Sequence, residues 1–376
     1  MSELHQEIKD QVQKFRTQFI DPIIEEDDEK EVFRLEIFQK LGELGFTGIT
    51  TSEQYNGAGL GYTDFCVFLE ELSKSSVPYA VTVSVSSMVQ SILQNFGNED
   101  QKNTYLPPLA SGNEIGAFAL SESSSGSDAT ALKTTAKEEG DHFVLNGSKL
   151  WITSAGVAKT YIVMARTGGA GSKGVSAFIV RDGDAGFSYG KTEKKMGWRT
   201  SPTRELLFEN CKISKDRLLG NVGEGMKVAL SALDAGRITI GAIAVGLSQR
   251  AVDESVKYSL TREQFNQSIF NFQGLQFMMA DMDLETQASR LLVYEAAKLL
   301  DENTPNQKLS SMAKLKATDV AMKVSTDAVQ VFGGVGYTKE YPVERLMRDA
   351  KVLQIVEGTN QIQRMVIARQ LKKQYS

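Results

Sequence analysis

The sequence predicts an α+β protein with an N-terminal helical domain, a middle antiparallel β domain and a C-terminal four-helix bundle. Three observations support this. The chain has 376 residues, which is longer than one ordinary domain. Apolar residues recur at spacings of three and four in its first and last parts. Short runs rich in Val, Ile, Thr and Phe fill the middle. We expect the domains at residues 1–115, 116–221 and 222–376.

The helical parts are predicted from amphipathic periodicity, which places apolar side chains on one face of a helix. The segments with this pattern are residues 31–45, 63–76, 85–97, 226–260, 272–302 and 312–334. The last three are long and closely connected, as in an antiparallel bundle. In the middle part, Asn146-Gly147 predicts a turn between two strands.

Composition excludes several classes of protein. A net charge of −5 argues against nucleic acid as the main partner. No uninterrupted apolar run has the roughly 20 residues of a membrane span, so we expect no membrane association. The N-terminus lacks the features of a signal or transit peptide. We therefore expect a cytoplasmic protein.

Histidine and cysteine usage restricts the chemistry further. His5 and His142 both lie in segments that we expect at the surface, which disfavours a Ser-His-Asp triad and a His-ligated metal. Cys66 and Cys211 fit no metal spacing, and we expect two reduced, buried thiols. No metal site is predicted. Acid–base chemistry must then use carboxylates, or a cofactor must supply the reaction.

Five segments carry a more specific signal. They are FALSESSSGSDATALKTTA (118–136), WITSAG (151–156), REQFNQSIFNFQ (262–273), QVFGGVGY (330–337) and IVEGTNQIQR (355–364). In order and spacing they resemble motifs of the acyl-CoA dehydrogenase family, closest to its short-chain (butyryl-CoA) branch. The resemblance covers essentially the whole chain. Ser123 stands where the family usually has proline, whose ring would hold that turn rigid.

The resemblance implies FAD as the cofactor, held without a Rossmann fold. The implied flavin-binding residues are Phe118, Leu120, Ser121, Ser127, Trp151, Ile152, Thr153, Arg262, Gln264, Phe265, Gln273, Gln330, Val331, Gly333, Gly334, Thr359 and Gln361. The segments at 262–273 and 330–334 resemble those that serve a neighbouring subunit's site. A homotetramer is therefore implied.

Glu357 is implied as the base that removes the α-proton of an acyl-CoA thioester, while flavin N5 takes the β-hydride. Without the resemblance, a glutamate just before a helix would more often be a solvated first-turn residue. Other family members place the base at the position that aligns with Gly236, which has no side chain. The implied substrate-side residues are Ser127, Asp234, Arg237, Val356 and Gly358.

The product is expected to be a trans-2-enoyl-CoA, with electrons passed to electron-transfer flavoprotein. Short straight acyl chains are expected first, and medium or branched chains remain open. The runner-up is an oxygen-using flavin oxidase or monooxygenase of the same fold. A non-catalytic relative that binds DNA is the third alternative, which the acidic net charge disfavours.

Overall fold

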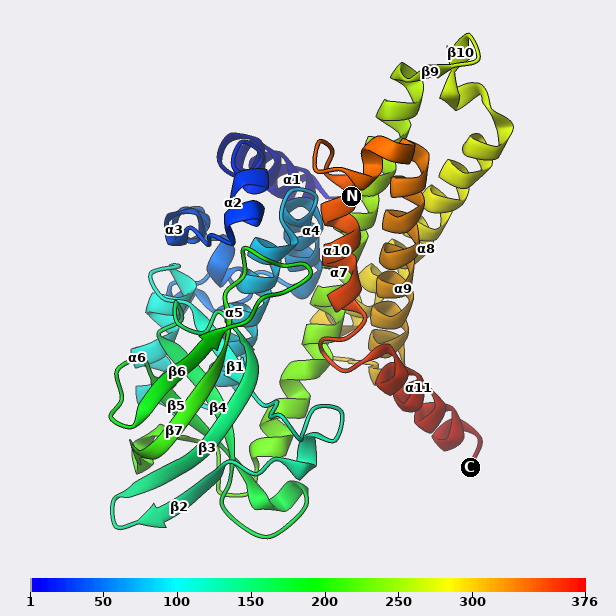
Figure 1. The fold of residues 1–376 in the computed structure, drawn as a ribbon. Coiled ribbons are helices and arrows are strands. Elements are labelled where there is room, and N and C mark those ends of the chain that lie inside the picture. Colours follow the sequence, from blue (N-terminus) through cyan, green and yellow to red (C-terminus); the bar gives the residue numbers. More distant parts are fainter. Residues whose placement is uncertain (1) are drawn as a thin grey trace.

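The computed structural model describes residues 2–376 and confirms the predicted order of helices, sheet and helices (Figure 1). The N-terminal helices are α1 (Glu3–Phe15), α2 (Ile24–Lys30), α3 (Leu35–Glu43), α4 (Tyr62–Ser73), α5 (Val77–Phe96) and α6 (Glu99–Ala110). The C-terminal helices are α7 (Gly225–Thr261), α8 (Gln273–Asp301), α9 (Gln307–Phe332), α10 (Val343–Leu353) and α11 (Asn360–Tyr375).

The middle strands form one eight-stranded sheet. They are β1 (Gly116–Ala119), β2 (Thr135–Glu139), β3 (His142–Thr153), β4 (Thr160–Arg166), β5 (Val175–Arg181), β6 (Phe187–Thr192), β7 (Thr203–Ser214) and β8 (Leu218–Leu219). A small hairpin, β9 (Glu263–Gln264) with β10 (Gln267–Ser268), joins α7 to α8.

The sheet is antiparallel except along one edge of β4, whose other edge pairs with β5 in the antiparallel sense. Strand β1 pairs with β4 in parallel, and β2 meets β4 in parallel at Thr135 and Arg166. This corrects the expectation of a wholly antiparallel domain. A parallel pair needs a long crossover, and the β2–β3 hairpin, inserted between β1 and β4, provides one.

The turn predicted at Asn146-Gly147 is wrong. Strand β3 runs through both residues, and its register against β7 shifts between Leu145 and Gly147, which marks a bulge. A Cβ on Gly147 would lie 2.8 Å from the Cα of Thr134, so only glycine permits this approach. The β2–β3 hairpin turns instead at Gly140, whose φ is 62°.

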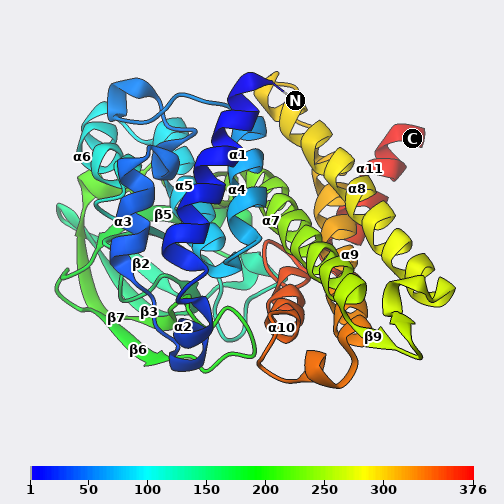
Figure 2. The ribbon, with the colours of Figure 1, turned by 90° about the horizontal axis from the view of Figure 1, so that it is seen from above.

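Helix α7 lies at the centre of the molecule, in contact with α4, α5, α8 and α9 (Figure 2). It contains an 18-residue window with a mean hydropathy of 1.6, which is apolar enough for a membrane span, but 72% of that window is buried inside the protein. Packing against helices of both helical domains explains its apolar character. The domains therefore share one core, and Cys66 and Cys211 are buried in it, as predicted.

The sheet domain is attached to α10 by one buried contact. Asp349 Oδ1 accepts a hydrogen bond of 2.6 Å from the backbone N–H of Trp198, and the indole donates to the Asp349 carbonyl at 3.1 Å. Burial raises the pKa of the Asp349 carboxyl to about 6. The contact fixes α10, and therefore the chain that follows it, against the loop between β6 and β7.

The close packing of α7 against α4 can be tested at Gly246 of α7. A Cβ on Gly246 would lie 2.1 Å from the Glu70 carbonyl oxygen and from Ser73 Oγ. We expect Gly246→Ala to destabilise the protein by about 1–3 kcal/mol through overpacking, measured as a lower urea midpoint. Gly274→Ala is the matched control, because a Cβ on this glycine of α8 meets nothing within 4 Å. Equal midpoints for the two variants would contradict the close crossing.

Candidate active site

Glu357 lies in the turn between α10 and α11. Its φ is 54° and that of Gly358 is 83°, so two consecutive residues are left-handed. This conformation costs a non-glycine residue about 1–2 kcal/mol, and such strain is often found at functional sites. Thr359 then begins α11, because its side chain accepts from the N–H of Ile362 at 3.3 Å. The helix start predicted after Glu357 is confirmed.

The Glu357 carboxylate points at α7. Its Oε2 is buried and has no hydrogen-bond partner among residues 2–376. A Cβ on Gly236 would lie 2.9 Å from this oxygen and 2.9 Å from the Met88 methyl group. A side chain at position 236 would therefore occupy the same space as the Glu357 carboxylate, and the glycine leaves that space open.

Burial raises the pKa of the Glu357 carboxyl to about 7, against the opposing charges of Arg237 and Lys314. Arg237 is itself buried, and its Nη1 donates to Asp234 Oδ1. Burial lowers the pKa of this guanidinium. The predicted substrate-side pair of Asp234 and Arg237 is thus also an ion pair along one face of α7.

A small cavity adjoins the carboxylate between α4, α5 and α7. It leaves about 10 Å³ of space for a water-sized sphere, room for about one water molecule. A hydrogen bond of 2.8 Å from Ser84 Oγ to Thr239 Oγ1 joins α5 to α7 in its wall. The lining residues are Tyr62, Phe65, Ser84, Ser87, Met88, Ser91, Ala232, Ala235, Gly236 and Thr239. Its hydroxyl lining was not predicted from the sequence.

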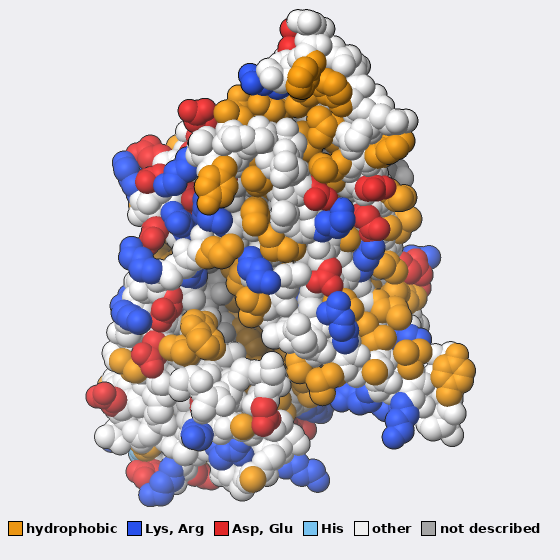
Figure 3. All heavy atoms as spheres, turned by 45° about the vertical axis from the view of Figure 1, so that its right-hand side comes forward, with side chains coloured by type: hydrophobic (Ala, Val, Ile, Leu, Met, Phe, Trp, Pro, Cys, Tyr) orange, Lys and Arg blue, Asp and Glu red, His pale blue; other side chains and the backbone are white. Residues whose placement is uncertain are grey.

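Trp151 stands out from the sheet domain. A register shift in β3 between Lys149 and Ile152 gives it a φ of 58° and leaves its side chain 57% exposed. The nearby residues Lys149 and Ile152 are buried. Only the backbone of Ile152 is therefore left to contact a ligand. The surface between the sheet domain and the bundle is hollowed (Figure 3). An exposed indole offers a flat apolar face to an aromatic ligand.

The segment 118–122 lies beside Trp151. The Lys149 ammonium bonds Glu122 Oε1 at 2.7 Å and the Leu120 carbonyl at 3.1 Å, and the Leu150 N–H donates to the Ser121 carbonyl at 2.9 Å. These bonds bring together the predicted residues Phe118, Leu120 and Ser121 with Trp151, Ile152 and Thr153. Ser127 is exposed in the loop that follows.

The predicted flavin residues of the segments 262–273 and 330–334 lie at the far end of the bundle (Figure 1), whereas Thr359 and Gln361 lie at the start of α11. Arg262, Gln264, Phe265, Gln273, Gln330, Gly333 and Gly334 are exposed there, and Val331 is buried. Stacked rings of Tyr258 and Phe332, with centroids 4.1 Å apart, join the ends of α7 and α9. Gly333 lies nineteen residues beyond Lys314, or roughly 28 Å along α9, and Lys314 bonds the Gly358 carbonyl.

Two further predicted residues, Gln361 and Val356, lie close to Glu357 in the sequence. The Gln361 side chain is exposed on the first turn of α11. Val356 is partly buried against the shared core. His5 and His142 each contact an aspartate, Asp64 and Asp141, away from this site.

Comparison with known proteins identifies the family. Residues 2–113, 117–211 and 223–372 match the N-terminal, middle and C-terminal domains of acyl-CoA dehydrogenases. The short-chain specific acyl-CoA dehydrogenase of Clostridium acetobutylicum is 45% identical over 363 residues, 96% of either chain. The chain belongs to the acyl-CoA dehydrogenase family.

Solved structures support this family assignment. Butyryl-CoA dehydrogenase from Megasphaera elsdenii superposes with a TM-score of 0.97 at 41% identity, covering 99% of this chain and 98% of that one. A chain solved in work on the electron transferring flavoprotein of Acidaminococcus fermentans has a TM-score of 0.97 at 48% identity, with the same coverage. The predicted fold and enzyme class are confirmed.

FAD is the cofactor of this family, and buried hydroxyls beside Thr153 fit a polar ligand. Ser154 Oγ, Thr200 Oγ1 and Ser201 Oγ are buried without a hydrogen-bond partner among residues 2–376. The Ser154 N–H donates to the Pro202 carbonyl at 2.8 Å, which joins the two segments. Buried polar atoms normally have partners. The sequence analysis missed Thr200 and Ser201, since isolated hydroxyls give no signal in one sequence.

In this acyl-CoA dehydrogenase, Gly236→Ala tests whether the space beside Glu357 is needed. The added methyl would lie within 2.9 Å of Oε2 and move the carboxylate. We expect at least a tenfold loss of kcat/KM, in line with the sensitivity of catalysis to displacements of about 1 Å. Helix propensity favours alanine by about 1 kcal/mol, so folding should survive. Ser231→Ala, exposed on the same helix, is the control. Full activity of Gly236→Ala would contradict the close contact.

Proposed function

We propose that the enzyme oxidises short-chain acyl-CoA thioesters to trans-2-enoyl-CoA, with Glu357 as the base that removes the α-proton. The observation that carries this is the buried Oε2 of Glu357, which has no hydrogen-bond donor and faces the cavity residues Gly236 and Met88. A carboxylate held there purely for stability would be expected to have a partner, because burying an unpaired charge is costly. Glu357 is therefore free to act on a ligand.

The raised pKa of Glu357 suits this role. An ordinary carboxylate is a very weak base for the α-proton of a thioester, and a base with a pKa near the working pH is most effective. Burial brings the pKa of Glu357 to about 7. The ionised form accepts the proton, so activity rises as pH increases through this value.

The backbone beside Glu357 supplies a donor for the thioester oxygen. The N–H of Glu357 makes no hydrogen bond within residues 2–376. Negative charge develops on the thioester oxygen as the α-proton leaves, and a fixed N–H near it lowers the barrier. We assign this donor role to Glu357, whose left-handed turn is fixed by the groups described below.

FAD, when bound, supplies the two-electron acceptor for this oxidation. Trp151, the backbone of 118–121 and the hydroxyls of Ser154, Thr200 and Ser201 are the residues that would hold it. The second set of predicted contacts, from Arg262 to Gly334, is too far along the bundle to line the same site. These residues would serve the site of another subunit.

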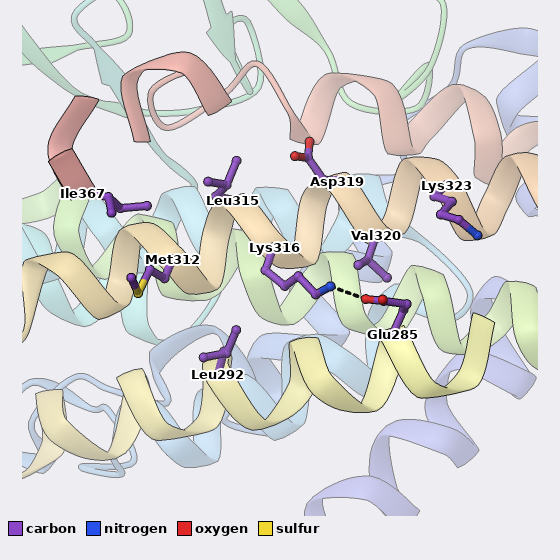
Figure 4. A pocket seen from close by; sticks show the side chains of 9 residues that line it. All are labelled: Glu285, Leu292, Met312, Leu315, Lys316, Asp319, Val320, Lys323 and Ile367. Atoms are coloured by element: carbon purple, nitrogen blue, oxygen red, sulfur yellow. Dashed lines mark hydrogen bonds and ion pairs between the residues drawn. The ribbon is translucent and has the colours of Figure 1, made fainter. Parts of the chain in front are cut away.

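The bundle surface supports a homotetramer. On α8, Phe277, Leu284 and Leu291 recur every seven residues and are 60%, 65% and 74% exposed. Such a stripe on a helix is the pattern of a helix–helix seam. Beside it lies an apolar groove between α8, α9 and α11, crossed by the ion pair of Lys316 with Glu285 (Figure 4). A second copy of the chain is the occupant that we propose.

Electron-transfer flavoprotein is the proposed acceptor of the electrons. The 48% identity to the chain from the Acidaminococcus work supports this acceptor over oxygen. Rapid reoxidation of the reduced enzyme by air, without this partner, would instead favour the oxidase alternative.

The cavity supports a preference for short straight chains. With room for about one water molecule, it must widen to take any acyl group, and each added carbon would widen it further; the bonded pair of Ser84 and Thr239 is its proposed floor. No lysine or arginine lines it, so a terminal carboxylate on the acyl chain would be buried unpaired. We therefore propose butyryl-sized, uncharged acyl groups as the substrate class.

Glu357→Gln tests the proposed base. The amide cannot accept the α-proton, so we expect flavin reduction by butyryl-CoA to slow by at least about 100-fold. The variant should still bind FAD and remain yellow. Anaerobic stopped-flow measurement of flavin bleaching gives the rate. Substantial reduction of the flavin in Glu357→Gln would rule out this assignment.

A panel of acyl-CoAs from C4 to C8 tests the cavity. We expect wild-type kcat/KM to be highest at C4 and to fall with length. The double variant Ser84→Ala, Thr239→Ala should raise the C8-to-C4 ratio of kcat/KM by about tenfold, since each buried methylene contributes about 0.8 kcal/mol. Thr82→Ala, a buried threonine of α5 that does not line the cavity, should leave the ratio unchanged. A wild-type optimum at C8 would contradict the proposed floor.

A further inference from the structure

Lys314 is a buried cation for which the proposed mechanism gives no role. It lies in the middle of α9 and is 0% exposed. Its ammonium donates to the Gly358 carbonyl at 3.0 Å and to Asn360 Oδ1 at 2.8 Å. Lysine is almost never fully buried unless its charge is compensated. Both acceptors, Gly358 and Asn360, lie within three residues of Glu357 in the segment that leads from α10 into α11.

The segment held by Lys314 is the strained turn. Gln363 is the second anchor, since its Nε2 donates to the Glu357 carbonyl at 3.0 Å and to the Gly358 carbonyl at 2.9 Å. Asn360 is bonded in turn to Thr318 and Asp319 of α9. Backbone strain of this kind persists only where the surroundings over-determine it. Lys314 is the only charged member of this set that contacts Gly358 within residues 2–376.

Lys314 is one of two buried cations whose charges act on the Glu357 carboxylate, and Arg237 is the other, with the larger effect. Arg237, on α7, is engaged by Asp234, and Asp319, on α9, is engaged by Arg364 at 3.0 Å. Burial lowers the pKa of the Lys314 ammonium to about 7, while the charges of Glu357 and Asp319 raise it. Lys314 makes no direct ion pair with Glu357 in residues 2–376, so its charge acts across the turn that it holds.

We propose that Lys314 is a positioning residue for the reaction: its ammonium holds the Gly358 carbonyl and sets a positive charge beside the Glu357 carboxylate. This inference rests on the proposed role of Glu357. The bond fixes the direction of the carboxylate and of the Glu357 N–H. The charge favours the ionised form of Glu357, which is the form that accepts the proton.

Two variants separate the charge from the hydrogen bond. Lys314→Met removes both, and Lys314→Gln keeps a donor for the Gly358 carbonyl without the charge. The Lys314 charge lowers the pKa of the Glu357 carboxyl, and a nearby opposite charge typically does so by about one unit or more. In the FAD-loaded enzyme, both variants should therefore move the acid limb of the kcat/KM profile upward by about one pH unit. At high pH, Lys314→Gln should retain more kcat than Lys314→Met.

Lys308→Met is the matched control. Lys308 lies on the same helix, α9, and its ammonium donates to Gln374 Oε1 at 3.2 Å, away from the turn at Glu357. This variant should keep the wild-type acid limb. Infrared difference spectra over the same pH range provide a readout without turnover, and Glu357→Gln identifies the band of this carboxyl. The midpoint of this band should shift in both Lys314 variants and stay constant in Lys308→Met.

The outcomes separate the two proposals. If Glu357→Gln keeps its activity, the proposed base is wrong. If Glu357→Gln is inactive but the folded Lys314 variants keep the wild-type acid limb and infrared midpoint, only the role of Lys314 is wrong. Equal kcat for Lys314→Met and Lys314→Gln at high pH would overturn the hydrogen-bond part. If Lys314→Met does not fold, Lys314→Gln still tests the charge.

Discussion

The structure around Glu357 depends on one constraint: a carboxylate oxygen is buried with no hydrogen bond to the protein. Such a group costs free energy and favours its neutral form, so its surroundings must hold it in place. Two consecutive left-handed residues present it, Gln363 and Lys314 bind the carbonyls behind it, and Gly236 leaves the space that it fills. The proposed role of Glu357 as the catalytic base accounts for each of these features, because a base must keep an oxygen free for the substrate.

The fold keeps these features in register by running α7 through a core shared by all three domains. Gly236 on α7, Met88 on α5 and Lys314 on α9 reach the same turn from three sides. The sheet domain is fixed to α10 through Trp198 and Asp349. A shift of any long helix would therefore alter both the cavity and the turn, because close-packed interiors transmit displacements.

Local sequence patterns predicted the helices well. They did not predict contacts between residues that are far apart in the sequence. The periodicity of residues 226–260 and 312–334 predicted α7 and α9, and a helix was expected just after Glu357, where α11 begins. The turn predicted at Asn146-Gly147 was wrong, because an Asn-Gly dipeptide is also found at a β-bulge, where another segment packs closely against the strand. Ser84 and Thr239 are 155 residues apart, and a single sequence gives no sign that they bond. A lysine in the middle of a predicted helix is normally expected in solvent, so the sequence did not indicate that Lys314 is buried.

In the proposed mechanism, the same protein charges are present before and after proton transfer. Before transfer, the buried charges are the Glu357 carboxylate, Lys314 and the pair of Arg237 with Asp234. After transfer, Glu357 would be neutral and the negative charge would be on the thioester oxygen beside the Glu357 N–H. The step therefore moves a charge within the site and creates none, so a buried site with fixed dipoles need not reorganise as the charge moves. A water-filled site would have to reorient its solvent at this point. The unpaired oxygen of Glu357 and the fixed cation behind it are two parts of the same arrangement.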